Sequence, residues 1–185
     1  MTMSRLYTFS LVAALLLLAA CADAAPTVAQ FRAELKALKA VTVSQKDYKA
    51  FARGIDSMLA YPDSQLPQLF NTTILVPTNK AIYALGIKTL QNSTAMEAIG
   101  KYNVLLRQLT GAQLLKLAAN TPLRTKAPKE LLARYASAGA NAGKAVLGPL
   151  NAPAAKQGVV LTPDLYAGKF LKVHGVSVFF RPKGY

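Results

Sequence analysis

The chain contains few side chains whose type and spacing could support catalysis. His174 is the single histidine, Cys21 is the single cysteine, and the eight acidic residues are scattered over 185 positions. A zinc site needs three or four protein ligands, and His174 has no nucleophile near it in sequence that it could activate as a general base. Gly139 and Gly143 lack the Lys-Ser/Thr ending of a phosphate-binding loop. We therefore predict a protein that is not an enzyme and that uses no cofactor and no metal.

The charge of the chain is strongly unbalanced. Lys and Arg total 22 against 8 Asp and Glu, which gives a net charge of +14. Such a surplus favours an acidic partner: nucleic acid, an anionic polysaccharide or an anionic membrane. Nucleic acid is disfavoured, because the aromatic residues follow core spacing instead of alternating with a basic stripe. We predict an acidic cell-wall polysaccharide or a matrix glycoprotein as partner; the alternative is a basic surface that only solubilises the protein.

The first 24 residues have the pattern of a targeting segment. Arg5 precedes the apolar run Phe9–Ala20, and the small residues that follow fit a small-x-small cleavage site. The run is short for a membrane span, which needs about 20 residues. We predict a signal peptide over 1–24, no membrane span, and a secreted protein of the extracellular space or cell wall. Two alternatives remain: an uncleaved anchor, and a bacterial-type surface lipoprotein lipidated at Cys21, because Leu18-Ala19-Ala20-Cys21 resembles a lipobox.

Two sequons indicate acceptors for N-linked glycans. They are Asn71-Thr72-Thr73 and Asn92-Ser93-Thr94. Modification of Asn71 would crowd the strand predicted beside it, so Asn92 is the better acceptor.

The first half of the chain reads mainly as helices around one strand. A helix is predicted over Pro26–Ala40, and a second one is predicted to start at Ser44 as its N-cap. The β-branched run Thr72–Val76 predicts a buried strand that Pro77 ends, with Thr78 or Asn79 capping the helix that follows. Three later elements complete this half: a helix whose capping box starts at Thr94, a strand from Val104, and a short helix capped by Thr110.

The second half predicts strands separated by a long irregular segment. Thr121–Lys126 suits a strand. The segment 127–157 is rich in Ala, Gly, Pro and Asn and has no regular hydrophobic pattern. Within it we predict only a helical turn at Glu130–Tyr135 and a short strand at Ala145–Leu147. Further strands are predicted at Gly158–Tyr166, Phe170–Val173 and Val176–Phe180. His174 then lies in a turn between the last two strands, where we interpret it as hydrogen-bonded to backbone.

Two boxes about 100 residues apart resemble the fasciclin domain family. The first matches the pattern Thr-(apolar)-Phe-Ala-Pro-Thr-Asp-x-Ala-Phe. The second matches a plant-type Val-His-Gly-Val pattern that is followed by an apolar strand closed by Pro. A position where the family has a Tyr-His pair lies between the two boxes. The matching residues are Thr73, Ile74, Val76, Pro77, Thr78, Asn79, Tyr102, Val173, His174, Gly175, Val176 and Pro182. This chain has Asn79 where the family has Asp, and Asn103 where it has His. We hypothesise that these two amides pair with each other.

The resemblance implies an α+β fold, a compact body in which a β-sheet wedge or sandwich packs with several α-helices. It implies a helical lead-in over 25–43 and a single fasciclin domain over 44–185, with an atypical loop at 127–157. It further implies a secreted, non-enzymatic adhesion or binding protein of the extracellular matrix or cell wall. The two boxes must then lie side by side, which would bring the segments of Ile74 and Val178 together.

Overall fold

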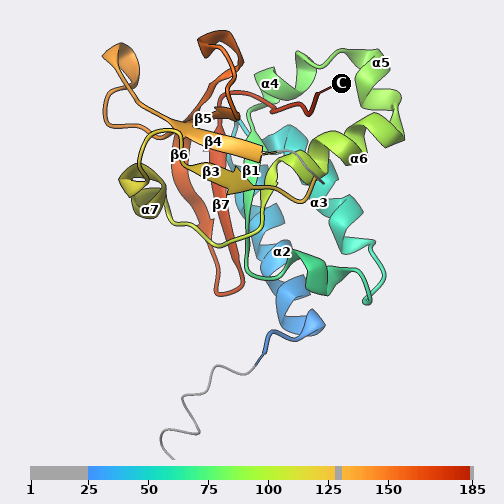
Figure 1. The fold of residues 1–185 in the computed structure, drawn as a ribbon. Coiled ribbons are helices and arrows are strands. Elements are labelled where there is room, and N and C mark those ends of the chain that lie inside the picture. The colour runs from blue at the N-terminus through green and yellow to red at the C-terminus, as the bar shows by residue number, and fades with distance from the viewer. Residues whose placement is uncertain (1–24, 128–130, 184–185) are drawn as a thin grey trace, which may run out of the picture.

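The computed structural model describes residues 25–127 and 131–183. The predicted signal peptide and Cys21 lie outside these ranges. The described chain is an α+β body in which helices gather beside a twisted sheet (Figure 1). Its α-helices are α2 Val28–Ser44, α3 Ala52–Leu59, α4 Asn79–Tyr83, α5 Ile87–Gln91, α6 Ser93–Tyr102 and α7 Gly111–Lys116. Its strands are β1 Thr72–Pro77, β2 Val104–Leu105, β3 Pro122–Arg124, β4 Leu131–Tyr135, β5 Val146–Pro149, β6 Gly158–Ala167 and β7 Leu171–Val176.

The strands of the described residues form one seven-stranded sheet in the order β2-β1-β7-β6-β5-β4-β3. Only β1 and β7 pair in parallel among these neighbours; the other pairs are antiparallel. A bridge between Leu105 and Thr125 joins the two edges of the sheet. The sheet is thus nearly closed, which leaves few unpaired edge groups.

The predicted contact between the two distant boxes is confirmed. β1 and β7 run side by side over six paired positions, and Ile74 lies opposite Val173. The residue expected near Ile74 was Val178, but β7 ends at Val176 and Val178 packs against a different part of the core. The predicted pairing of the two boxes is therefore correct, but the residue opposite Ile74 is Val173 instead of Val178.

The core has two parts, one on each side of the β1–β7 pair. The first lies under α2 and α3 and includes Phe31, Leu35, Leu38, Ile55, Ile74 and Val173. The second lies inside the curved sheet and includes Leu75, Tyr102, Leu105, Leu132, Leu147, Val176 and Phe180. Because side chains of β1 alternate between the two faces, Ile74 and Leu75 enter different parts of the core.

Several predicted boundaries are wrong. Ser44 does not cap a second helix: it lies in the last turn of α2, where its hydroxyl donates to the Val41 carbonyl. The second helix comes later, as the 3-10 helix η1 Lys49–Phe51 followed by α3. The capping residue of α6 is Asn92 instead of Thr94, since the Asn92 Oδ1 accepts from the Ala95 N–H at 3.0 Å.

The second half of the chain is more regular than we predicted. The helical turn predicted for Glu130–Tyr135 is wrong: its first residue lies outside the described ranges and the remainder forms β4. The described part of 127–157 is not a loose loop, because β4 and β5 pair there, with the 3-10 helices η3 Gly139–Asn141 and η4 Ala154–Lys156 beside them. Of the two strands predicted around His174, the first continues through His174 to Val176 as β7, and the second is wrong because residues 177–180 form no strand.

Candidate functional site

The first predicted box forms β1 and the start of α4, and its hydroxyls make specific hydrogen bonds. The Thr73 hydroxyl donates to the Arg107 carbonyl and accepts from the Leu109 N–H, both at 2.8 Å. Thr78 caps α4 by accepting from the Ala81 N–H at 3.3 Å, as predicted. Ile74, Val76 and Pro77 are buried. The box therefore fixes where α4 leaves the sheet.

Asn79 connects the first turn of α4 to the loop before η1. Its Oδ1 accepts from the Ala50 N–H and its Nδ2 donates to the Lys46 carbonyl, both at 2.7 Å. Its backbone N–H donates to the Asp47 carbonyl at 2.6 Å. An aspartate could accept from Ala50 but could not donate to Lys46. The amide at this position thus supplies a bond that the family's usual Asp cannot make.

Asn103 anchors the segment that follows β7. It is 2% exposed, and its Nδ2 donates to the carbonyls of Ile99 and Phe180, each at 2.8 Å. Its Oδ1 accepts from the Phe180 N–H at 3.2 Å. The hypothesis that Asn79 and Asn103 pair with each other is wrong, because each amide is bonded to backbone groups of a different segment.

His174 lies in the middle of β7 and is fully buried. Its Nδ1 accepts from the Asp164 N–H at 2.9 Å, so its Nε2 carries the proton and donates to the Leu109 carbonyl at 2.7 Å. Burial lowers the pKa of His174 below 6.5, and the Leu109 carbonyl and the Asp164 carboxylate, 3.9 Å away, oppose that shift. The prediction that His174 lies in a turn is wrong, because it lies within a strand. The prediction that its side chain is hydrogen-bonded to backbone groups is confirmed. With both nitrogens engaged, the ring ties β6 and the loop before α7 to β7.

The glycine of the second box is explained by a close approach. A Cβ on Gly175 would overlap the ring and hydroxyl of Tyr48. The buried Tyr48 hydroxyl shares a hydrogen bond of 2.8 Å with Thr162 on β6. The motif Val173-His174-Gly175-Val176 is thus a packing element, in which both valines are buried as well.

The remaining box residues are also structural. Tyr102 is fully buried and its hydroxyl donates to the Leu131 carbonyl at 2.9 Å, which connects α6 to β4. Pro182 is buried at the end of the described tail. Of the predicted box residues, the structure brings Thr78 and Asn79 to a surface groove and places the others mainly in the interior.

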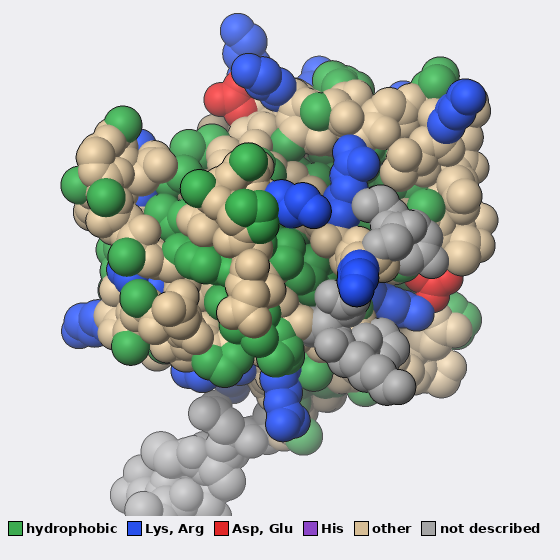
Figure 2. Space-filling model, turned by 45° about the horizontal axis from the view of Figure 1, so that its top comes forward, with side chains coloured by type: hydrophobic (Ala, Val, Ile, Leu, Met, Phe, Trp, Pro, Cys, Tyr) green, Lys and Arg blue, Asp and Glu red, His purple; other side chains and the backbone are tan. Residues whose placement is uncertain are grey.

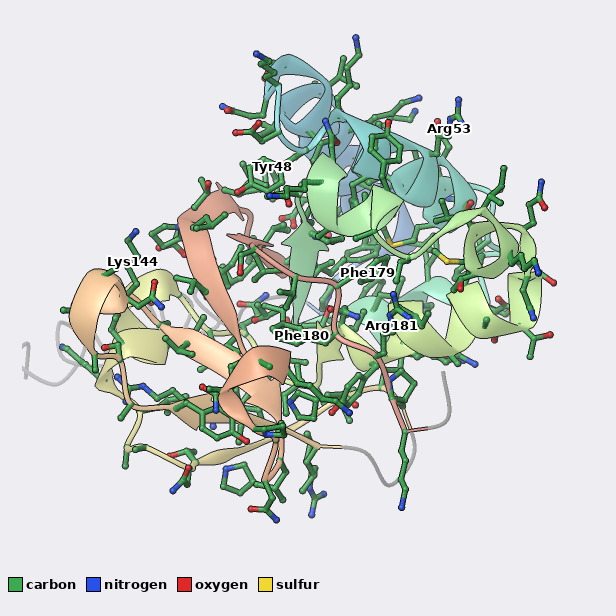
Figure 3. The ribbon with its side chains drawn as sticks, turned by 90° about the horizontal axis from the view of Figure 1, so that it is seen from above. Tyr48, Arg53, Lys144, Phe179, Phe180 and Arg181 are labelled. Atoms are coloured by element: carbon green, nitrogen blue, oxygen red, sulfur yellow. The ribbon has the colours of Figure 1, made fainter. Side chains whose placement is uncertain are left out.

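The groove lies between α4 and the tail that follows β7. Its volume is about 570 Å³, and its lining is mostly apolar. The residues that line it are Asp47, Thr78, Asn79, Lys80, Ala81, Ala84, Leu85, Leu161, Ser177, Val178, Phe179 and Arg181. Figure 3 shows Phe179 and Arg181 along the tail, between the helices on one side and the sheet on the other. This volume falls in the range of small-molecule sites.

Backbone and side-chain bonds hold both walls of this groove. The Thr78 N–H donates to the Val176 carbonyl at 3.0 Å, which joins the start of α4 to the end of β7. Ser177 is held to β6, because its N–H donates to the Val159 carbonyl and its hydroxyl accepts from the Val159 N–H. Together with the Asn103–Phe180 bonds, these contacts place Phe179 and Arg181 at a fixed position.

Basic side chains outnumber acidic ones on the surface of the described chain. In Figure 2, Lys and Arg project from many places on the face that includes the top of the molecule, while acidic side chains are few. Three carboxylates of the described chain form ion pairs with cations: Asp63 with Arg32, Asp56 with Lys39, and Glu97 with Lys101. Lys80 and Arg181 have no carboxylate partner among the described residues, and both are exposed.

The two predicted glycan acceptors lie in different surroundings. Asn71 is exposed with a φ of 57°, but the threonine of its sequon, Thr73, is fully buried and hydrogen-bonded. Asn92 and Thr94 are both exposed. Because the Asn92 cap uses Oδ1, the Nδ2 that a glycan would modify makes no hydrogen bond within the described part of the chain.

No cluster of metal-ligating side chains occurs in residues 25–127 and 131–183. They contain no group of three His, Cys, Asp or Glu residues that could hold a metal ion. Among the same residues, no helix is both long enough and apolar enough to cross a membrane. The groove presents apolar side chains together with the cations Lys80 and Arg181.

Sequence reasoning missed the residues that form the groove. The apolar run Val176–Phe180 predicts a strand, and a strand gives no reason to place Phe179 and Arg181 at a groove. A usable signal was present: Phe179-Phe180-Arg181-Pro182 places a cation and a proline directly after the apolar run. Proline cannot continue a ladder of hydrogen bonds, so the run could have been read as an extended tail.

Comparison with known proteins supports the fold alone. No protein-family profile and no curated protein sequence matches the chain. A solved structure of a FAS1 domain pair from the insect cell adhesion molecule fasciclin I is similar, with a TM-score of 0.51 and 17% sequence identity. The match covers 80% of this chain and 45% of that one, so the chain spans less than half the length of this neighbour. The protein therefore has the fasciclin (FAS1) domain fold.

Proposed function

We propose that the protein is a secreted, non-enzymatic fasciclin-type adhesion domain that binds acidic polysaccharide or matrix glycoprotein of the extracellular matrix or cell wall. The fold supports the adhesion role, because a similar domain pair comes from a cell adhesion molecule. The observation that carries the choice of ligand is the surplus of cations, 22 against 8 acidic residues. An acidic polymer offers the complementary charge in a repeating form.

Most acidic side chains of the described residues already bond to a cation or to backbone N–H groups. They therefore do not neutralise the remaining Lys and Arg side chains on the surface. Besides the three ion pairs, Glu34 accepts from the backbone N–H groups of Lys169 and Phe170, and Asp164 accepts from the Gly111 N–H. Each exposed contact between a cation and a carboxylate contributes little in water and is screened by salt. Binding to a polymer would therefore need many contacts at once, whose effects combine through multivalency.

Retention on immobilised polygalacturonate across a salt series tests this proposal. Retention is expected in dilute buffer and should fall steadily toward 1 M NaCl. A matched resin that carries a neutral polysaccharide is the control, and a DNA resin tests the nucleic-acid alternative. Absence of retention on polygalacturonate even at the lowest salt would remove the charge argument, and stronger retention on DNA would assign the surface to another partner.

The export route is proposed from the sequence of residues 1–24. We expect signal-peptide cleavage near Ala24, since small residues precede this position. Mass spectrometry of the mature N-terminus after secretion from a eukaryotic host and after expression in a bacterium distinguishes the routes. A start near Ala25 in both hosts agrees with secretion, whereas an acylated Cys21 would support the lipoprotein alternative.

A further inference from the structure

We propose that the groove between α4 and the C-terminal tail is a subsite for a single uronate unit of an acidic glycan. This inference rests on the proposed function and locates its specific contact. It assigns the ring of Phe179 as the surface for the sugar ring, and Lys80 and Arg181 as the partners of the carboxylate. The groove brings together an aromatic side chain and two exposed cations that have no carboxylate partner among the described residues.

The apolar lining fits the C–H face of a pyranose ring. Leu161 is 46% exposed on β6, and Val178 and Phe179 on the tail are only half-buried. An aromatic ring carries negative potential on its face, which attracts the polarised C–H bonds of a sugar. A carboxylate that carries an alkyl chain would also fit such a lining. A fatty-acid probe is therefore needed to distinguish an acyl chain from a sugar ring.

The two cations come from opposite walls of the groove. Lys80 belongs to the first turn of α4, while Arg181 follows Phe180 on the tail and donates to the Ala84 carbonyl at 3.5 Å, a long contact. An arginine guanidinium can bind a carboxylate through two parallel N–H groups. Because the walls are held by hydrogen bonds, ligand binding would need to order the two cationic side chains but not the backbone that carries them.

Asp47 is the acidic side chain of the groove lining. Its removal should change the affinity in the opposite direction from removal of the cations. Its carboxylate is exposed, and only its backbone carbonyl takes part in holding α4. A bound uronate would be repelled by this charge. Removing the charge with Asp47→Asn should therefore raise the affinity, whereas a structural role for this side chain predicts no gain.

Calorimetric titration of the folded chain with trigalacturonate in dilute buffer tests the subsite. Lys80→Gln and Arg181→Gln should each weaken binding about fivefold, the size of one exposed charged contact. Phe179→Leu keeps an apolar side chain but removes the aromatic face, and should weaken binding about threefold. Asp47→Asn should strengthen it. A thermal melt of each variant shows whether it is folded, and Lys80 and Arg181 are exposed enough to be changed without loss of the core.

Arg53→Gln and Lys144→Gln are the matched controls. Arg53 lies on α3 and Lys144 lies between η3 and β5, and both are exposed and apart from Phe179 and Arg181 (Figure 3). Each control removes the same charge as its partner variant and should leave trigalacturonate binding within about twofold.

Equal effects of the control and groove variants would overturn the subsite. If wild-type protein is then still retained on polygalacturonate in a salt-dependent way, the broader function stands and binding is spread over the surface. If the wild-type protein is not retained on polygalacturonate, the proposed function itself is contradicted. Binding of dodecanoate at the groove without binding of trigalacturonate would overturn the subsite in favour of an acyl chain.

Discussion

Asn103 and Phe180 are joined by two hydrogen bonds, although 77 positions separate them in the chain. The amide donates to the carbonyl of Phe180 and accepts from its N–H, so it pairs with the tail as a neighbouring strand would. The tail is thereby held against α6 with Phe179 on one side of the anchor and Arg181 on the other. A buried amide at a position where the family has His thus fixes the geometry of the groove.

Replacement of Asn103 by Ala should destabilise the protein and loosen the tail. The change leaves the buried N–H and carbonyl of Phe180 without partners, which costs about 1–3 kcal/mol of unfolding free energy. Urea denaturation measures this loss. Gln91→Ala is the control, because Gln91 is exposed at the end of α5 and should change the stability by less than about 0.5 kcal/mol. Equal stabilities for the two variants would mean that the anchor contributes nothing.

Mild acidification should destabilise the protein through His174. Burial lowers its pKa in the folded state below the ordinary 6.5, so between these two values the unfolded state binds a proton that the folded state does not. The unfolding free energy is then unaffected by this group above pH 6.5 and falls as the pH decreases below it, by at most about 1.4 kcal/mol per pH unit.

The charged group that faces this ring is the Asp164 carboxylate, and its attraction for a proton opposes the effect of burial. NMR titration of the imidazole gives the folded-state value directly, because His174 is the single histidine of the chain. The variant His174→Gln should lose this component of the pH dependence in denaturation experiments between pH 5 and 8. A folded-state pKa at or above 6.5 would contradict the prediction.

Gly175→Ala should destabilise the fold by overpacking. The added methyl group would overlap Tyr48, and accommodating it should cost about 1–3 kcal/mol. Gly100→Ala is the matched control, since a Cβ on that helical residue meets no atom within 4 Å and alanine favours a helix by up to about 1 kcal/mol. Thermal melts of the two variants should therefore shift in opposite directions, and a shift in the same direction would show that Tyr48 moves aside easily.

Glycosylation should favour Asn92 over Asn71. The Asn92 sequon is exposed and the cap of α6 uses only the Asn92 Oδ1, whereas Thr73 of the other sequon is buried and bonded to the loop at 107–109. Glycopeptide mass spectrometry of protein secreted from a eukaryotic host measures the occupancy of each site. Ser93→Pro eliminates the Asn92 sequon as a control for assignment. Higher occupancy at Asn71 would mean that modification precedes formation of β1.

Local patterns were sufficient for the elements that bury one clear face. The caps predicted at Thr78 and Thr110 both appear as side-chain hydrogen bonds in the structure. The β1–β7 pairing could be inferred because the resemblance linked two apolar runs far apart in sequence. The caps depend on hydrogen bonds between residues that are near in sequence, whereas the β1–β7 pairing was predicted from the resemblance.

Other features depend on contacts between distant segments and could not be predicted locally. Leu131–Tyr135 has no strong strand signal and becomes β4 because it pairs with both β3 and β5. Tyr48 and Gly175 contact each other only in the folded chain. The groove likewise requires α4 and the tail to meet, so its residues could be identified only from the structure.

Binding to two forms of the same polymer tests the central claim most directly. Polygalacturonate and its fully methyl-esterified form share a sugar backbone, but only the first carries carboxylates. Surface plasmon resonance in dilute buffer should show binding of the folded protein to the free acid and at least a tenfold weaker response to the ester, because the basic surface needs a complementary charge. Equal binding to the two forms, or binding to neither, would contradict the account.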